Sequence, residues 1–398
     1  MSEIKVYGFR WIVLLLFIFA NITIQILWIS FASVTSYATV YYDVEEIMIF
    51  LLSAIFMIVY IPVTFLSAWL IDKYDFKVGA GIGAVLQGIF GFLRYLAGPN
   101  FMLVFIFQLG IAFGQPFLLN SVTKLSANWF PESERTTATG LGLIAGFLGI
   151  ALGLAVTPFI VEGMTFQMMV LIYGILAVAS GVLFILFAKN RPPTPPSSDI
   201  LTEKVMMGEG MKQLFTNKYF LVLILVSFIG LGIFNMVTTY IEVIFIPRGF
   251  SSTDAGIIGG LMLLGGIIGC IIMSGISDQY QKRKILLILS LLMATISLFV
   301  ISFVRNKILL YIFAFIFGFG LISAFPVALE YAVDITSPVP EASSNGILIM
   351  VGQIGGILFI LGLEDFKTPA GDYFPALLLE SILLLVCLLL IFLIKEKK

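Results

Sequence analysis

Long apolar stretches separated by short polar ones run through the whole chain. A helix that crosses a membrane needs about 20 mainly apolar residues. Windows of this kind cover twelve segments: 10–40, 46–70, 78–98, 101–124, 136–162, 165–188, 219–246, 254–277, 283–303, 308–333, 345–363 and 373–394. Six windows precede the middle of the chain and six follow it. The pattern predicts an all-α integral membrane protein whose twelve transmembrane helices form two pseudo-symmetric six-helix bundles.

The second half of the chain repeats landmarks of the first half at a nearly constant offset. Asp72 and Tyr74, which follow the second apolar window, return 206 residues later as Asp278 and Tyr280. A second set returns 206 or 207 residues later: Pro131, Glu134 and Gly140 reappear as Pro338, Glu341 and Gly346. Parallel repeats of this size build one large class of secondary transporters, with the substrate site near the bilayer midplane between the halves. The repeat therefore points to transport as well as to fold.

The longest polar stretch lies between the two halves. Its proline-rich opening, 191–198, cannot continue a helix. We expect residues 1–190 to form the first bundle, 191–218 a cytoplasmic linker and 219–398 the second bundle. The rest of the linker, with methionines and Leu214 among charges, is predicted to be either a simple tether or a short amphipathic helix at the membrane interface.

Composition and charge agree with a chain that lies in lipid. Hydrophobic residues make up 60% of the 398 residues and charged residues 11%, too few to cover a water-soluble globule of this size. If the N-terminus is inside, 17 of the 22 Lys and Arg residues fall on the cytoplasmic side. We therefore expect a multi-pass protein of the cell (plasma) membrane with both termini in the cytoplasm and with its first span retained.

Several function classes lack the residues they need. The chain has no histidine to ligate haem iron or relay protons, and its two cysteines, Cys270 and Cys387, lie in apolar windows. It has no phosphate-binding loop for ATP, and the acidic run 43–46 lacks the partners of an enzyme site. We expect no enzyme activity, no cofactor, no metal and no nucleic acid. The expected partners of the monomer are a small-molecule substrate, the lipid bilayer and a coupling ion such as the proton, unless the substrate gradient alone drives transport.

The loop after the second window resembles a signature of the major facilitator superfamily, Gly-x-Leu-x-Asp-Lys/Arg-x-Gly-Arg/Lys-Lys. The matching residues are Leu70, Asp72, Lys73 and Lys77. The departures are Ala68 and Asp75 at the glycines and Phe76 at a basic position. The resemblance implies the two-bundle fold of that superfamily and transport by alternating access.

In such a loop a carboxylate can accept hydrogen bonds from a helix N-terminus and from an arginine, latching one state of the transporter. We expect Asp72 to pair with Arg135, which follows the fourth window. Asp278 occupies the repeated position, but Ala342 stands where the second arginine would be. The predicted latch is therefore asymmetric. The alternative is that Asp72 and Asp278 are ordinary solvated loop charges.

Three further charges are candidates for gating or coupling, because ionisable groups within spans are costly and often functional. Lys124 and Glu330 occupy equivalent positions of the repeat with opposite charge. They are predicted to pair when the cytoplasmic side closes, unless both simply reach the interface. Glu242, near the outer end of the seventh window, is predicted to attract a cation or carry a coupling proton, unless it faces external water.

Uncharged polar and aromatic residues at mid-depth are the candidates for substrate contact. They are Gln25 and Trp28 in the first window, Gln115 and Asn120 in the fourth, Asn235 in the seventh and Gln353 in the eleventh. Each one has the alternative role of a helix–helix hydrogen bond. Together they predict a cavity without a dominant fixed charge, suited to a small amphiphile or cation rather than a phosphate ester.

A closer resemblance covers roughly residues 20–160 and, more weakly, 218–290. It rests on Trp28, Tyr41-Tyr42, Tyr60-Ile61-Pro62, Trp69 to Asp72, and Ser126 to Phe130 with Glu134. These residues look like the solute carrier group named for the feline leukaemia virus subgroup C receptor. The resemblance implies transport of choline or ethanolamine, with haem export also attributed to the group. It also places Trp28 in an aromatic cage that binds a quaternary ammonium by cation–π attraction.

The chain departs from this group at two positions of the expected pocket. Gly146-Phe147 stands where the group has an Asn-Gln pair, and Asn235 replaces a tyrosine of the seventh span. Phe147 therefore joins the candidates for substrate contact. The hypothesis is a secondary or facilitative transporter of a small organic solute such as a choline-like amine. The alternatives are a proton-coupled exporter of amphiphilic compounds and a non-transporting receptor of the same fold.

Overall fold

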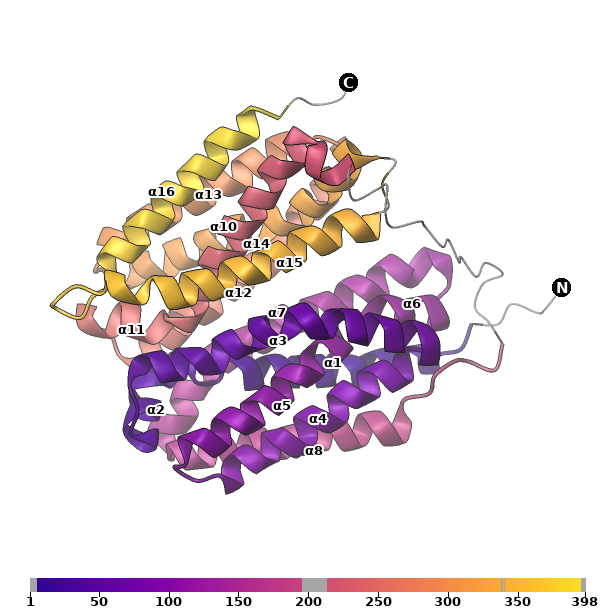
Figure 1. The fold of residues 1–398 in the computed structure, drawn as a ribbon, viewed down its shortest axis with the longest axis horizontal. Coiled ribbons are helices and arrows are strands. Elements are labelled where there is room, and N and C mark those ends of the chain that lie inside the picture. The colour runs from indigo at the N-terminus through magenta and orange to yellow at the C-terminus, as the bar shows by residue number, and fades with distance from the viewer. Residues whose placement is uncertain (1–5, 195–212, 338, 340, 395–398) are drawn as a thin grey trace. The chain divides into compact units, whose positions relative to one another are not determined.

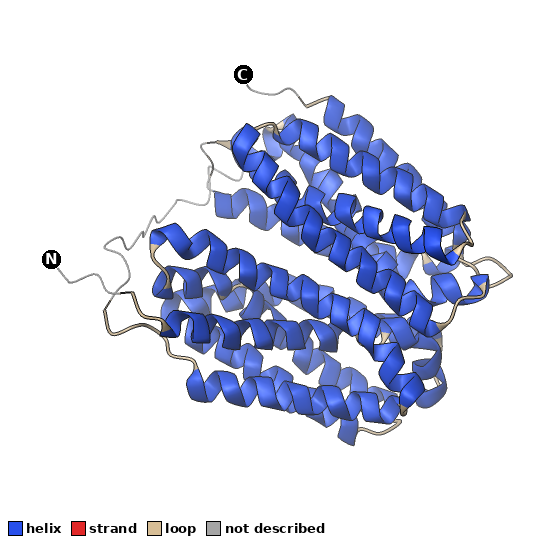
Figure 2. Ribbon diagram, turned by 180° about the vertical axis from the view of Figure 1, so that it is seen from behind, coloured by secondary structure: helices blue, strands red, loops and turns tan. Residues whose placement is uncertain are grey.

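The computed structural model describes residues 6–194, 213–337, 339 and 341–394. Across these residues the backbone forms helices joined by loops and turns, and no strand (Figure 2). Within them, twelve helical segments are long and apolar enough to cross a membrane. The predicted all-α membrane fold is thereby confirmed. Most of the predicted linker, including its amphipathic part, lies outside the described residues.

The chain divides into two compact units, Met1–Thr202 and Glu203–Lys398. The helices of the first unit run from indigo to magenta in Figure 1. They are α1 (Phe9–Ile29), the 3₁₀ turn η1 (Ala32–Val34), α2 (Thr35–Tyr42), α3 (Glu46–Tyr74), α4 (Phe76–Leu96), α5 (Phe101–Leu119), α6 (Val122–Trp129), α7 (Glu132–Gly163) and α8 (Phe166–Phe187). In this unit α1 packs on α7 and α8, and α4 packs on α5 and α8.

The second unit repeats the pattern with its own short interruptions. Its helices are α10 (Lys218–Thr239), α11 (Ile241–Phe245), η2 (Ile246–Arg248), α12 (Ser252–Tyr280), α13 (Arg283–Phe303), α14 (Lys307–Thr336), α15 (Glu341–Gly362), η3 (Glu364–Phe366) and α16 (Phe374–Phe392). Here α14 packs on α12 and α13, and α10 packs on α15.

Polar residues at or just before the start of the apolar windows begin several of the spans. In each case a side-chain oxygen accepts a hydrogen bond from a backbone N–H of the first turn, which has no partner inside the helix. The residues that do so are Asn100, Thr165, Asn217, Ser251 and Asn306. These caps explain why the spans begin where they do.

The first span is shorter than its apolar window. The window 10–40 predicts one helix, but α1 ends at Ile29 and the chain continues through η1 into α2. Ser30 donates its hydroxyl to the Leu27 carbonyl, and Thr35 donates to the carbonyls of Phe31 and Ala32. Such local side-chain bonds compete with regular helix, which an apolar count does not register.

Glycines allow the closest helix contacts in both units. A Cβ atom at Gly149 of α7 would lie 2.5 Å from the Ile22 carbonyl oxygen of α1. A Cβ atom at Gly318 of α14 would overlap the Met262 carbonyl oxygen of α12. At these positions two backbones meet directly, as expected for small residues in membrane helices.

Candidate transport site

The polar side of α1 carries two of the predicted substrate-contact residues, and the structure joins one of them to α5. The Gln115 amide donates from Nε2 to Gln25 Oε1 over 3.0 Å. Both side chains are buried within the first unit. The sequence predicted each residue separately; the structure brings them together as one neutral hydrogen-bonded pair.

Trp28 lies one turn further along α1 and is fixed against α3. Its indole Nε1 donates to the Ser53 carbonyl oxygen at 3.1 Å. Its ring centroid lies 6.4 Å from that of Phe56, with the planes tilted by 48°. Because the N–H is committed to a backbone carbonyl, the indole ring has a fixed orientation in the bundle.

The backbone of α7 closes over the same stretch of α1. A Cβ atom at Gly146 would lie 3.5 Å from Gln25 Nε2 and 3.7 Å from Asn21 Nδ2. Asn21 Nδ2 also donates to the Gly142 carbonyl at 2.8 Å. The next residue of α7, Phe147, is half-buried. At these distances a Cβ atom would make ordinary van der Waals contact with the two amides, so position 146 has room for a methyl group beside Gln25.

Asn120 follows the end of α5 and ties it to α3. Its Nδ2 donates to Thr64 Oγ1 at 2.9 Å and to Ser67 Oγ at 2.7 Å. These bonds match the alternative role given to this residue from the sequence, that of a hydrogen bond between helices.

The second unit carries the remaining predicted contact residues. Asn235 is buried on α10 and donates to the Leu231 carbonyl of the preceding turn at 2.8 Å. Gln353 is half-buried on α15. Since an asparagine bonded to its own helix keeps its side-chain oxygen available, Asn235 retains an acceptor for a ligand.

Glu242 lies on the short helix α11 and is fully buried. Its carboxylate accepts a hydrogen bond from the Ser252 hydroxyl at the start of α12. In this structure Glu242 therefore belongs to a buried polar contact rather than facing external water.

At the junction of α3 and α4, the buried carboxylate is Asp75 rather than the predicted Asp72, which is exposed. Asp75 Oδ1 accepts from the Phe76 N–H at 3.0 Å and from Asn128 Nδ2 at 2.6 Å. Its Oδ2 accepts from the Arg191 guanidinium at 2.6 Å. The carboxylate thus joins α4 and α6 to the first residue of the predicted linker.

Neighbouring bonds hold the same segment. Asn190 Oδ1 accepts from the Lys77 N–H at 3.2 Å, and Trp129 Nε1 donates to the Lys189 carbonyl at 3.0 Å. Residues 189–191 are therefore docked on the end of the first bundle. The sequence held a signal for this role, because Asp75 is an acidic residue at a glycine position of the signature.

The backbone explains why the signature has a glycine there. Asp75 has φ of 78°, in the region that glycine adopts most readily. Gln281, its counterpart 206 residues later, has φ of 55°. Both repeats keep a positive φ between their second and third spans without a glycine, at some cost in backbone strain.

Asp75 also leads to a pH prediction. Burial alone would raise the pKa of its carboxyl, but the bonds from Asn128, the Phe76 N–H and Arg191 outweigh burial and hold the pKa below its usual value of 3.8. A lowered pKa means that the attachment is fully stabilised above about pH 4 and loses that stabilisation as the pH falls through the lowered pKa.

We expect Asp75→Asn to raise amide hydrogen exchange in residues 76–80 and 189–194 by about fivefold, because a partly exposed ion pair and its hydrogen bonds contribute roughly 1 kcal/mol. The increase should be present at neutral pH and should vanish in strong acid, where the wild type loses the same contribution. Exchange followed by mass spectrometry measures it, with exposed Asp72→Asn as the matched control. Equal exchange in Asp75→Asn and wild type would contradict the anchoring role.

At the equivalent end of the second unit the buried charged residue is an arginine instead of an aspartate. Arg283, at the start of α13, bonds two carboxylates of α14, those of Glu330 (Nη2 to Oε2, 3.2 Å) and Asp334. Glu330 therefore has a partner inside its own unit, whereas Lys124 is half-buried on α6 of the first unit. A Lys124–Glu330 pair between the units stays a prediction. Sequence reasoning missed Arg283, which it counted only as a cytoplasmic charge.

The residues of the predicted latch lie near the ends of their helices, and two of them are exposed. Asp72 and Asp278 are both exposed. Arg135 donates from Nε to the Phe130 carbonyl at 3.3 Å. Its neighbour Glu134 forms a two-point ion pair with Arg10, at 2.9 and 3.2 Å, which fixes the start of α1 to α7. The predicted pairing of Asp72 with Arg135 stays a prediction.

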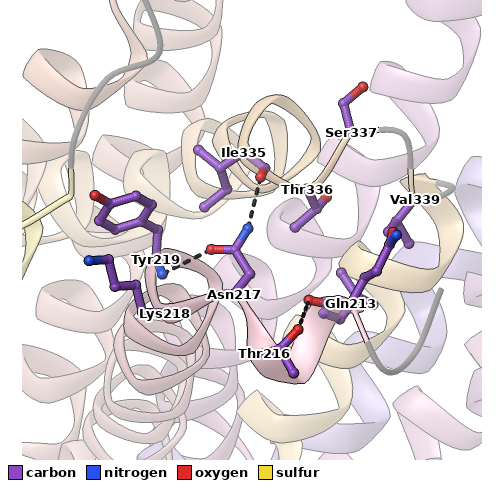
Figure 3. A pocket seen from close by; sticks show the side chains of 10 residues that line it. Gln213, Thr216, Asn217, Lys218, Tyr219, Ile335, Thr336, Ser337 and Val339 are labelled. Carbon is purple, nitrogen blue, oxygen red and sulfur yellow. Dashed lines mark hydrogen bonds between the residues drawn. The ribbon is translucent and has the colours of Figure 1, made fainter. Parts of the chain in front are cut away.

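A pocket of about 550 Å³ lies where α10 begins in the second unit (Figure 3). Asn217 stands at its centre, donating from Nδ2 to the Ile335 carbonyl at 2.9 Å and accepting from the Tyr219 N–H at 3.0 Å. The remaining lining is contributed by residues 213–219 and by the end of α14. None of the predicted substrate-contact residues lines this pocket, and its bonds attach the start of α10 to the end of α14.

This chain is similar in sequence to a named solute carrier and to a named transporter. Solute carrier family 49 member A3 of Xenopus tropicalis is 29% identical over 391 residues, covering 94% of this chain and 81% of the relative. The choline/ethanolamine transporter FLVCR2 of Homo sapiens is 28% identical over 399 residues, covering 94% and 76%. These relatives confirm the resemblance to the carrier group named for the feline leukaemia virus receptor.

Solved transporters share the fold. A bacterial homolog of the human lysosomal transporter Spinster, inward-facing and unoccupied, superposes with a TM-score of 0.78 at 14% identity, covering 98% of this chain and 97% of the other. The nucleoside transporter NupG superposes with a TM-score of 0.74 at 14% identity, covering 96% and 100%. The profile of the Major Facilitator Superfamily matches residues 8–360. This chain belongs to the Major Facilitator Superfamily, a family of transporters and not of enzymes.

Proposed function

We propose that the protein is a secondary transporter that moves a small organic amine of the choline or ethanolamine kind across the cell membrane. The named function of FLVCR2, 28% identical along nearly the whole chain, supports this class of substrate. Transport would proceed by alternating access. The proposed orientation places both termini in the cytoplasm, and the proposed working form is a monomer.

The observation that carries the proposal is the fixed indole of Trp28 beside a neutral amide pair. A quaternary ammonium binds over an indole face by cation–π attraction of roughly 0.5–2 kcal/mol. The Gln25–Gln115 pair offers donors and acceptors for a hydroxyl or amine without adding a fixed charge. This combination suits a small cation with one polar end.

Residues of the other elements complete the proposed site. Phe147 of α7 would contribute a second aromatic side chain, and Asn235 and Gln353 would contribute amides from the second unit. In the related group the position of Asn235 is a tyrosine, so the pocket of this protein would bind its amine with one fewer ring and one more hydrogen-bonding group. We therefore expect ethanolamine, whose primary ammonium donates hydrogen bonds, to be favoured over the fully methylated choline.

The test is uptake of labelled choline and ethanolamine into liposomes that contain the purified protein, with and without a proton gradient. Saturable uptake that each unlabelled amine inhibits is the expected result. Binding without uptake would instead favour a receptor of the same fold. Export of unrelated amphiphiles, driven by a proton gradient, would instead favour the exporter.

Glu242 is the proposed site of ion coupling. A fully buried carboxylate is costly in a membrane protein and is usually retained because it binds a cation or carries a proton. We expect uptake by Glu242→Gln down a substrate gradient to stay within about twofold of wild type, because the amide keeps the contact to Ser252. The variant should lose most of its response to an imposed proton gradient, because an amide carries no titrating proton. Uptake measured in matched liposomes checks this. Asp254→Asn, at the start of α12, is a control for a nearby acidic residue. An unchanged gradient response in Glu242→Gln would remove Glu242 from coupling.

A further inference from the structure

Arg94 is a buried cation that the function described so far does not use. It lies in the last turn of α4 with only 1% of its surface exposed. The charge count of the sequence places it among the five Lys and Arg residues outside the cytoplasmic side, and the structure adds that its side chain is buried in the first unit. Within the described part of the chain its partners are neutral: the Leu27 carbonyl, Gln108, and the ring of Phe31 at 5.1 Å.

The guanidinium and Gln108 form a clamp that reaches two helices. Arg94 Nη1 donates to the Leu27 carbonyl of α1 at 3.1 Å and to Gln108 Oε1 at 2.9 Å. Gln108 Nε2 donates to the same Leu27 carbonyl at 3.4 Å and to the Leu52 carbonyl of α3 at 3.2 Å. One side chain of α5 and one of α4 thus hold α1 and α3 together.

The two clamped carbonyls directly precede the residues of the indole contact. Leu27 precedes Trp28, and Leu52 precedes Ser53, whose carbonyl accepts the indole N–H. The clamp and the indole bond are therefore adjacent links between the same two helices. Any change in the spacing of α1 and α3 at the clamp moves Trp28 relative to its acceptor.

The charge of Arg94 is explained by the end of α1. Because α1 ends at Ile29, the Leu27 carbonyl lies in its last turn, where carbonyls lack helical partners and carry partial negative charge. A guanidinium is favoured there. Even so, its Nε and Nη2 are buried without hydrogen-bond partners among the described residues, which is costly for a residue that only fills space.

We propose that Arg94 and Gln108 are positioning residues for Trp28, setting the depth and angle at which the indole meets the substrate. This inference rests on the proposed function only in so far as Trp28 contacts the substrate. The positioning itself is a property of the first unit and has its own readout.

Gln108→Glu separates positioning from stability. The new carboxylate keeps an acceptor for Arg94 and gives the buried cation a counter-charge, but it removes both donors to Leu27 and Leu52. We expect the thermal midpoint to be unchanged or higher, while KM for choline or ethanolamine rises about tenfold, because small displacements of a binding group are costly. Arg94→Lys should restore most of the affinity that Arg94→Met loses, since an ammonium still caps the Leu27 carbonyl.

The independent readout is the fluorescence of Trp28 in a chain whose other three tryptophans, Trp11, Trp69 and Trp129, are replaced by phenylalanine. In this background Gln108→Glu should shift the emission and increase quenching by acrylamide. Gln87→Glu is the matched control, because Gln87 is an equally buried glutamine that bonds Ser180 instead. It should leave the Trp28 emission unchanged.

Unchanged emission and unchanged KM in Gln108→Glu would overturn the inference. If the wild type transports neither amine, the proposed function fails, but the emission still decides whether the clamp positions Trp28. A shifted emission with unchanged KM would also overturn it, since the indole would then move without consequence for the substrate.

Discussion

Trp28→Ala should weaken amine uptake more than any other single change to the proposed site. The variant removes the ring that would face the cation, a loss of roughly 1–2 kcal/mol or about 5- to 30-fold in affinity. It also removes the bond to the Ser53 carbonyl, which leaves α1 and α3 less firmly joined. Concentration-dependent uptake of choline and ethanolamine into liposomes measures the effect.

Two companion variants give this experiment its control. Trp28→Phe keeps an aromatic face but loses the indole N–H, so it should fall between wild type and alanine. Trp69→Ala removes a tryptophan that is 54% exposed at the end of α3, and it should leave affinity unchanged. Wild-type affinity in Trp28→Ala would exclude Trp28 from the site and leave the family assignment intact.

The second large effect is expected on stability, from Gly318→Ala. The added methyl group would overlap the Met262 carbonyl oxygen where α12 and α14 meet backbone to backbone. The helices can accept it only by moving apart, which costs about 1–3 kcal/mol or more for overpacking. Thermal unfolding in detergent, followed by tryptophan fluorescence, should show a lower midpoint.

The matched control for Gly318→Ala has the opposite expected sign. Gly275 lies on α12 of the same helix pair, and no neighbouring atom of the described residues lies within 4 Å of a Cβ atom placed there. Alanine in an open helical position stabilises by about 0.5–1 kcal/mol relative to glycine. A midpoint that rises or stays level in Gly275→Ala and falls in Gly318→Ala identifies steric contact as the cause. An unchanged midpoint in Gly318→Ala would show that the two backbones are not so close.

The span count was predictable because each span must carry its own apolar length, whatever it packs against. The ends of the spans were less predictable. The window 10–40 continues past Ile29, since Phe31, Ala32 and Val34 are as apolar as the helix before them. What ends α1 is the local bonding of Ser30 and Thr35, together with the cap that Arg94 provides from another helix.

Individual polar residues were recognisable, but their partners were not. Gln25 and Gln115 were predicted from their depth in the membrane, while their contact depends on how α1 packs against α5. Arg94 looked like an external charge because it stands four residues before the loop 98–100. Only its tertiary contacts show that it points into the bundle. A motif matched by position also drew attention to Asp72, although the buried carboxylate of the loop is Asp75.

The positive φ of Asp75 makes the shape of its loop depend on other parts of the chain. A glycine would adopt that conformation freely, so the turn would persist with or without neighbours. The aspartate must instead be held there by Asn128 and Arg191, which belong to α6 and to the chain after α8. The order of this loop therefore reports whether the connection to the second unit is docked, a dependence that the usual glycine would not create.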